Sequence, residues 1–228
     1  MDAKNDLTGK ALAGIFRFQA ALAVLIFLPA FSLRYWQGWL FWLVFFASIL
    51  VITLYFLKHD PALVRRRMKA GPTAEQQTSQ KLIQLFAMLA LCAVIILSAL
   101  DHRYVWSSVS PLLAVAGDVL VVLGFAIVFV VFRENSFAAS TITVAPDQWV
   151  IATGPYALVR HPMYAGAVFM FVGMPLALDS LWGLLPAALL MAVIIWRLLD
   201  EEQYLDRHLA GYPAYRQLVR SRLIPGIW

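Results

Sequence analysis

Long uninterrupted apolar runs constrain this chain more than any other feature of its sequence. A helix needs about 20 mainly apolar residues to cross the hydrocarbon core of a bilayer. Four segments meet that requirement, at residues 12–33, 36–57, 82–100 and 112–132. Of the 228 residues 62% are hydrophobic and only 14% are charged, which is too much apolar surface for one soluble core. The sequence therefore predicts an integral membrane protein.

Two further apolar segments, at residues 163–178 and 181–195, are shorter and are separated only by Asp179-Ser180. They predict a tight helical hairpin. No alternation of apolar and polar residues indicates a strand. The predicted fold is thus all-α with six transmembrane helices, or five in the alternative count. We expect a single membrane domain over 1–228, with a four-helix part at 1–132 and a cytosolic catalytic part within 133–228.

The basic residues predict the orientation of the chain. With six crossings, one side of the membrane receives both termini and the second and fourth loops. All 18 Lys and Arg residues except Arg34 and Arg103 then lie on that side. Cytoplasmic loops carry such an excess, so both termini are predicted to be cytoplasmic. Because these charges flank apolar segments, the net charge of +5 does not indicate binding to nucleic acid.

The second loop contains a basic cluster on a predicted short helix. Asp60-Pro61 supplies an N-cap and a first helical residue for a helix over 62–69. Its three arginines at 65–67 are interpreted as an anchor to anionic headgroups, with a site for a substrate phosphate as the alternative. Three apolar side chains of this helix are expected to contact lipid: Leu63, Val64 and Met68.

The residues that indicate chemistry follow the fourth long apolar segment. Gly154 and His161 each precede a proline, which disfavours helical geometry, so both are expected to be extended. A helix is predicted to begin at Pro162, because proline is comfortable in a first turn. Arg160 and His161 would then lie at a helix N-terminus, where free amides and the helix dipole favour anions.

A second cluster lies where the last apolar segment ends. Arg197 and Glu201 are four residues apart, so an ordinary surface ion pair is one interpretation. The acidic run that includes Glu201 and Glu202 is either a solvated helix end or functional. An anion-binding mouth beside an acidic cluster suits a ligand of mixed charge, and S-adenosylmethionine is such a ligand. The single cysteine, Cys92, excludes an internal disulfide and a cysteine-rich metal site, and no metal is predicted.

Two blocks of the sequence resemble the isoprenylcysteine carboxyl methyltransferase family. The first runs from Gly154-Pro155-Tyr156 through Arg160-His161-Pro162-Met163-Tyr164 to Ala165-Gly166. The second consists of Glu201-Glu202, Leu205, Gly211-Tyr212, Tyr215 and Arg222-Leu223-Ile224-Pro225. Their order and spacing both match over about residues 130–228. The short chain is most similar to the small prokaryotic members, which implies an inner-membrane location.

The resemblance implies an S-adenosylmethionine-dependent methyltransferase acting at the cytosolic face of the membrane. It implies that His161 and Tyr164 contact the cofactor. It also implies that backbone near Gly154 and Gly166 shapes the cofactor pocket. The expected partners are an amphipathic or lipid-like acceptor and membrane lipids, while the oligomeric state is left open.

The same resemblance assigns catalytic and substrate-binding candidates. Glu201 or Glu202 would hold the amino group of the cofactor or face the acceptor. Arg160 would orient a carboxylate of the acceptor or of the cofactor. Asn135 and Arg197 are the substrate-binding candidates, with a helix-end cap as the alternative role of Asn135. Carboxyl O-methylation is the leading expectation. Phospholipid N-methylation and an NADPH-dependent reduction of the sterol-reductase kind are the alternatives.

Overall fold

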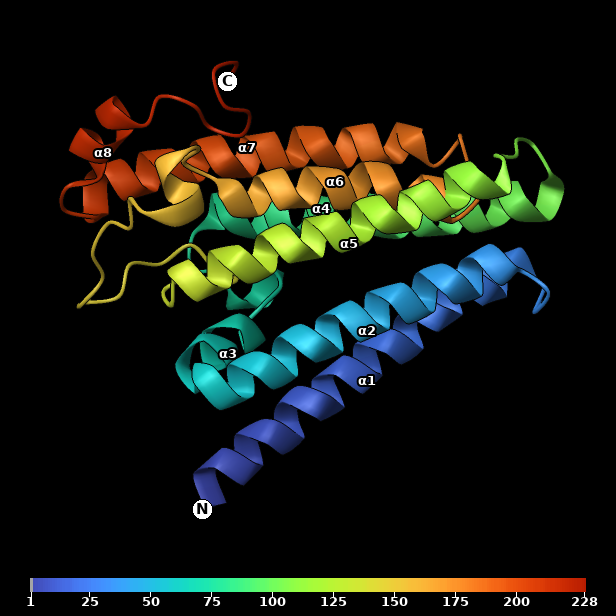
Figure 1. The fold of residues 1–228 in the computed structure, drawn as a ribbon, viewed down its shortest axis with the longest axis horizontal. Helices are drawn as coiled ribbons and strands as arrows, with labels where there is room; N and C mark the ends of the chain where they lie inside the picture. The colour runs from blue at the N-terminus through green and yellow to red at the C-terminus, as the bar shows by residue number, and fades with distance from the viewer. Residues whose placement is uncertain (1) are drawn as a thin grey trace.

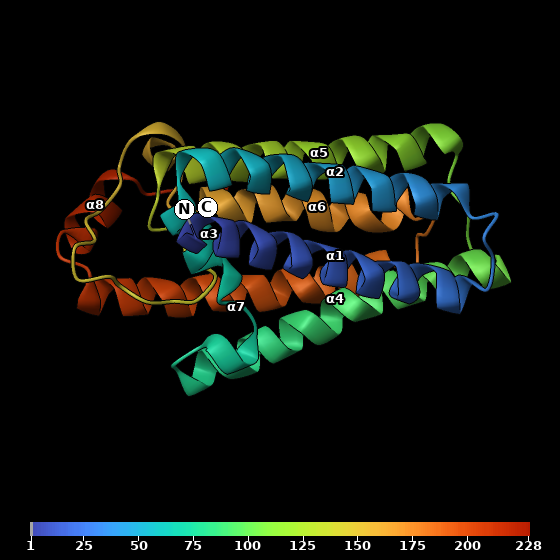
Figure 2. The ribbon, with the colours of Figure 1, turned by 90° about the horizontal axis from the view of Figure 1, so that it is seen from below.

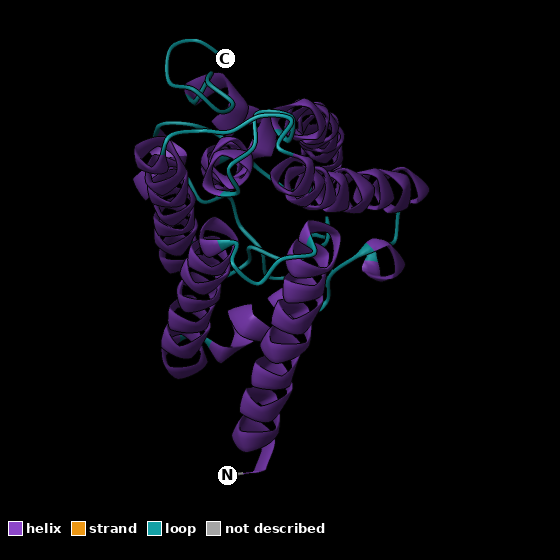
Figure 3. Cartoon of the chain, turned by 90° about the vertical axis from the view of Figure 1, so that its right-hand side faces the viewer, coloured by secondary structure: helices purple, strands orange, loops and turns teal. Residues whose placement is uncertain are grey.

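The computed structural model describes residues 2–228, with side chains from Asp6 onward, and it is an all-α integral membrane protein. Four helices are long and apolar enough to cross a membrane: α1 (Asp2–Ala30), α2 (Trp36–His59), α4 (Thr78–Tyr104) and α5 (Pro111–Glu134). They confirm the first four predicted segments. The described residues form no strand, and Figure 3, which looks along the bundle, shows helices joined by loops only.

The predicted hairpin is present as α6 (Pro162–Ala177) and α7 (Leu184–His208), joined by a short turn. α6 begins at Pro162, as expected. The turn contains Asp179 with a φ of 56°, a left-handed conformation that Asp tolerates better than most residues. At 16 residues α6 is shorter than a standard span, and the second half of α7 is charged. Full crossing by this hairpin therefore stays a prediction.

The chain runs along the bundle six times, so both termini lie at the same end (Figures 1 and 2). That end also carries α3 (Pro61–Met68), the loop between α5 and α6, and α8 (Tyr212–Leu218). We call it the loop-bearing end. The arrangement agrees with the predicted grouping of basic residues. The side of the membrane on which this end lies stays a prediction.

Glycines allow α5 and α6 to approach closely. A Cβ added at Gly124 would lie 2.5 Å from the carbonyl oxygen of Gly166, and one added at Gly173 would lie 2.5 Å from that of Gly117. The two glycines on each helix are seven residues apart, or about two turns. Two antiparallel backbone contacts therefore hold α6 against α5, which is the usual role of small residues between membrane helices. This contact fixes the position of the first turn of α6.

The short helix α3 is present, but its contacts differ from the prediction. The Asp60 side chain accepts a hydrogen bond from the backbone N–H of Leu63 at 3.0 Å, which confirms the N-cap. Leu63 and Val64 are buried against α1, α2 and α5. The expectation that they contact lipid is therefore wrong, because α3 turns back under the bundle. Of the three apolar residues, Met68 alone is exposed.

The headgroup-anchor interpretation is wrong for Arg67, and it stays a prediction for Arg65 and Arg66. Arg66 donates from Nη1 to the carbonyl of Ser136 at 2.7 Å, and Arg67 donates from Nη1 to the carbonyl of Ala139 at 2.9 Å. The Arg67 guanidinium also lies 4.9 Å from the ring centroid of Phe132, whereas Arg66 is only partly buried and Arg65 is exposed. The two hydrogen bonds form because the loop after α5 offers unpaired backbone carbonyls directly opposite α3.

At the opposite end of the bundle, buried carboxylates hold the turns together. Asp101 accepts hydrogen bonds from the hydroxyls of Ser107 and Ser180, both at 2.6 Å. Asp179 accepts one from the amide of Gln37 at 2.9 Å. These contacts join the ends of α2, α4 and α6 and hold this end of the bundle closed.

Candidate active site

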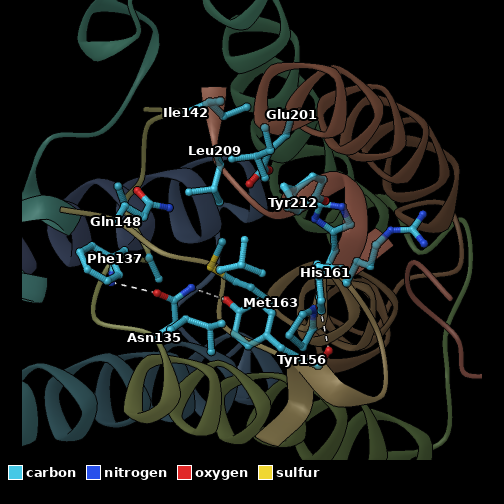
Figure 4. A pocket seen from close by; sticks show the side chains of 18 of the residues that line it. Asn135, Phe137, Ile142, Gln148, Tyr156, His161, Met163, Glu201, Leu209 and Tyr212 are labelled. Atoms are coloured by element: carbon cyan, nitrogen blue, oxygen red, sulfur yellow. Dashed lines mark hydrogen bonds between the residues drawn. The ribbon is translucent and has the colours of Figure 1, made fainter. Parts of the chain in front are cut away.

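A cavity opens at the loop-bearing end, between the loop after α5, the first turn of α6, the second half of α7 and α8 (Figure 4). Its walls bring together two distant parts of the sequence, residues 135–164 and 201–215. The labelled side chains that line it are Asn135, Phe137, Ile142, Gln148, Tyr156, His161, Met163, Glu201, Leu209 and Tyr212. It is thus a mixed site, with aromatic and aliphatic walls and a few polar groups, which is typical of small-molecule sites.

Glu201 is the acidic residue in the wall of this cavity. Its Oε2 accepts a hydrogen bond of 2.6 Å from the Tyr164 hydroxyl. That hydroxyl in turn accepts one of 3.1 Å from Nε of Arg197. Glu201 is only partly buried, and Oε1 has no hydrogen bond to the described residues. One carboxylate oxygen is therefore held in place while the other remains available to a ligand.

The predicted surface ion pair between Arg197 and Glu201 is wrong. Arg197 is buried, and its Nη2 forms an ion pair with Glu75 at 2.8 Å. The same side chain donates to Gln80 at 2.8 Å and to the carbonyl of Ser140 at 3.0 Å. Sequence spacing could not show this, because the acidic partner comes from the loop before α4. Arg197 reaches the cavity only through the Tyr164 hydroxyl and lines a neighbouring pocket.

Glu202 lies outside the cavity wall and is surrounded by cations. Its carboxylate accepts from Nε of Arg160 at 2.6 Å and from Nε of Arg222 at 2.9 Å, with His161 Nε2 at 3.3 Å. It lies beyond the apolar part of α7 and is almost fully buried. Burial alone would raise its pKa. Hydrogen bonds from His161, Arg160 and Arg222 outweigh that effect and lower the pKa of Glu202 to about 2.

Arg160 fixes the C-terminal segment against α6. Besides Glu202, it donates from Nη1 to the carbonyls of Val219 at 2.8 Å and Arg220 at 2.7 Å. Its guanidinium is thus occupied by the chain itself, although the residue borders the cavity. A positioning role follows more directly from these contacts than orientation of a substrate carboxylate.

His161 precedes α6 and lines the cavity. Its φ of −125° and ψ of 61° lie outside the helical region, but they are not the extended conformation that was expected before a proline. The anion-binding mouth predicted here is partly filled, because the backbone N–H of Arg160 donates to Ser221 and that of His161 donates to Arg222. The C-terminal segment supplies these carbonyls, and nothing local in the sequence indicates that it folds back this far.

Neither of the two predicted pocket glycines lines the cavity. Gly154 is exposed and has a φ of +56°, so the expectation of an extended conformation is wrong. Glycine adopts this left-handed region without steric cost, and the side chain of Glu134 lies beside it. Gly166 faces α5 and serves helix packing.

Asn135 lies both at the helix end and in the cavity wall. It is the C-cap of α5, and its Oδ1 accepts from the backbone N–H of Phe137 at 2.9 Å. Its Nδ2 donates to the Tyr156 hydroxyl at 2.9 Å (Figure 4). Burial raises the pKa of Tyr156 to about 12, against a lowering by this hydrogen bond. The hydroxyl thus stays protonated at neutral pH.

Several cavity residues have no role in the sequence-based assignment. They come from the loop at 137–151 and from α8, notably Gln148, Tyr212 and Tyr215. The Tyr212 hydroxyl is buried and has no hydrogen-bond partner among the described residues. Burial raises the pKa of Tyr212, so this hydroxyl is a donor that a ligand could satisfy. The length of the connection between α5 and α6 is the sequence feature that points to this loop, since a connection beyond roughly 15 residues is commonly functional.

Comparison with known families places most of this cavity in one matched segment. Residues 112–211 match the family described as "Phospholipid methyltransferase", a membrane methyltransferase family related to the one that the motifs resemble. The match covers α5 to α7 and includes His161, Tyr164 and Glu201. A comparison with curated proteins gave no match. The family match supports a membrane methyltransferase with a lipid-like substrate.

Proposed function

We propose that the chain transfers a methyl group from S-adenosylmethionine to a lipid-like acceptor at the loop-bearing end of the bundle. The observation that carries the proposal is the cavity, most of which lies in the matched segment. Glu201, His161 and Tyr212 all line it, and the Tyr212 hydroxyl has no hydrogen-bond partner among the described residues. An amine of a phospholipid headgroup is the acceptor we place first, because the family match names phospholipids.

The residues of the cavity fit the proposed cofactor. The cofactor carries an ammonium, a carboxylate and an adenine. The available Oε1 of Glu201 suits the ammonium, and the orphaned hydroxyl of Tyr212 is a donor for a carboxylate or an adenine nitrogen. Phe137 and Trp149, which lie edge to face at 4.8 Å between centroids, offer aromatic surface in the same wall. These groups would hold the cofactor without any metal.

The chemistry requires alignment more than proton transfer. When bound, S-adenosylmethionine supplies an electrophilic methyl group on a sulfonium. The chain's own contribution is to hold the acceptor in line and to exclude water, and such positioning can contribute about 7–11 kcal/mol. A protonated amine acceptor must also lose a proton. The amine releases that proton to solvent before it reacts, because Oε1 of Glu201 is already assigned to the ammonium of the cofactor.

The test is calorimetric binding of S-adenosylmethionine to the purified chain in detergent, with NADPH measured beside it. We expect saturable binding of the former, weakened at least tenfold by Glu201→Gln. The matched control is Asp147→Asn, which removes a carboxylate from the same end of the bundle but outside the cavity. Binding of NADPH instead, or of neither compound, would overturn the proposal.

A carboxylate of an isoprenylcysteine is the second candidate acceptor, because of the two motif blocks that resemble that family. The two acceptors are separated by the stability of the product. A methyl ester releases its label as methanol in mild base, whereas an N-methyl group does not. The chain is incubated with methyl-labelled cofactor and either phosphatidylethanolamine or a farnesylcysteine derivative. We expect base-stable label on the phospholipid.

A further inference from the structure

A second pocket adjoins the cavity on the side of α3. It is lined by Arg65, Arg66 and Lys69 on one side and by the loop after α5 on the other. Five of its lining residues are shared with the candidate active-site cavity: Phe137, Ala139, Thr141, Thr143 and Gln148. A ligand group held in this pocket would therefore be next to one held in the cavity. We call it the basic pocket.

The charge of the basic pocket is entirely positive. Arg65 and Lys69 are exposed, lie four residues apart, and have no ion pair or hydrogen bond from their side chains to the described residues. Arg66 is held by the carbonyl of Ser136, with its guanidinium 5.4 Å from the centroid of Phe137. Among the side chains that the structure describes, none that lines this pocket is acidic. Neighbouring carboxylates line a different pocket, on the other side of Arg66: Asp60, Glu134 and Asp147.

The other face of α3 borders apolar space. Leu63 and Val64 line a groove together with Phe56, Phe125 and Phe132 from α2 and α5. That groove is a suitable surface for an acyl chain, because aromatic and aliphatic side chains provide most of its lining. α3 therefore separates apolar space from a cationic pocket, and the cationic pocket leads into the cavity that contains Glu201.

We infer that Arg65, Arg66 and Lys69 bind the phosphate of the acceptor phospholipid, and so place its headgroup amine in the cavity beside Glu201. In a phospholipid the phosphate lies between the acyl chains and the amine, and the basic pocket lies between the cavity and α3, whose other face lines the apolar groove. These three cations lie outside the matched segment at 112–211. The inference rests on the proposed function, and it assigns acceptor specificity to a part of the chain that the family match does not reach.

An isoprenylcysteine acceptor would not need this pocket. Its single anion is the carboxylate that itself receives the methyl group, so it has no second anion for a cluster of three cations. A phosphate accepts charge-assisted hydrogen bonds from arginine and lysine together. Removal of these cations should therefore discriminate between a phosphate-bearing acceptor and a phosphate-free one.

The experiment measures binding of two fluorescent probes in a neutral detergent free of anionic lipid. One probe is a phosphatidylethanolamine and the other is a long-chain amine with the same fluorophore but no phosphate. The variant is Arg65→Gln with Lys69→Gln, which leaves the structural contact of Arg66 intact. The matched control is Lys58→Gln with Lys81→Gln, which removes the same charge from two exposed positions outside the basic pocket.

We expect the variant to raise the Kd of the phospholipid probe about tenfold, which corresponds to about 1.4 kcal/mol, and to leave the amine probe unchanged. The control should change neither. Equal weakening of both probes by the variant, or equal weakening by variant and control, would overturn the inference. Because this readout needs no cofactor, a chain that binds the phospholipid through these cations but does not bind S-adenosylmethionine would refute only the proposed function.

Discussion

At the scale of single residues, Glu201 and Glu202 are neighbours with different surroundings. One step along a helix rotates a side chain by about 100°, so Glu201 enters the cavity while Glu202 meets Arg160, His161 and Arg222. One carboxylate is available to a ligand and the other is consumed by the fold. The first role is a proposal, whereas the second follows from the contacts.

This difference predicts that the same Glu→Gln substitution has unequal effects on stability at the two positions. Glu202→Gln leaves Arg160 and its neighbours without their buried counter-charge and should destabilise the chain by about 3 kcal/mol. Glu201→Gln removes a carboxylate that is partly exposed and should leave the melting temperature nearly unchanged. Thermal unfolding in detergent, followed by circular dichroism, measures both. Equal melting temperatures for the two variants would contradict the assignment.

The lowered pKa of Glu202 also predicts a loss of stability in acid. The carboxylate has a pKa of about 2 in the folded chain, against a usual value of 4.5. Its contribution is fully present above pH 4.5 and is lost as the pH falls through 2, because protonation breaks the ion pairs. The shift corresponds to about 3 kcal/mol. The stability difference between wild type and Glu202→Gln should therefore shrink between pH 4.5 and 2, and a constant difference would refute this.

At the scale of elements, the contact between α5 and α6 positions the first turn of α6 and with it His161. The contact depends on two pairs of glycines whose backbones meet directly. Backbone atoms cannot move aside as the end of a flexible side chain can. The tolerance of this interface for even one added methyl group should thus be low.

Gly124→Ala should accordingly destabilise the chain by about 1–3 kcal/mol, the usual cost of overpacking. The matched control is Gly14→Ala on α1, where an added Cβ meets nothing within 4 Å. The control should be neutral or slightly stabilising, since alanine is the better helix former. Melting curves of the two variants in the same detergent provide the measurement. A Gly124→Ala chain as stable as the control would show that α5 and α6 can separate freely.

At the scale of the whole molecule, the bundle has two unlike ends. The loop-bearing end holds the cavity, both termini and most of the basic residues, while the opposite end is closed by buried carboxylates. Because Lys and Arg favour the cytoplasm, the cavity is expected to open there, where S-adenosylmethionine is made.

Cysteine labelling of intact cells should show this orientation. In a Cys92→Ser background, Ser108→Cys lies at the closed end and Gln217→Cys lies on α8. An impermeant maleimide added outside the cells should label position 108 and should reach position 217 only after the membrane is permeabilised. The reverse pattern would place the cavity outside the cell.

The sequence by itself determined the local features of this protein. The apolar runs, the cap at Asp60, the start of α6 at Pro162 and the hairpin turn at Asp179 all depend on residues within a few positions of one another. Side-chain hydrophobicity and backbone geometry act over that range, so these predictions were confirmed. The family match at residues 112–211 covers the first motif block and only the beginning of the second.

The tertiary structure decided which partners the polar residues have. Arg197 meets Glu75 rather than Glu201, and the mouth of α6 is filled by carbonyls of residues 219–222. Both outcomes arise because a buried cation must find an oxygen wherever the packed helices bring one, whatever its distance along the chain. For the same reason, only the packed chain shows that Glu201, Tyr212 and the loop after α5 share one cavity.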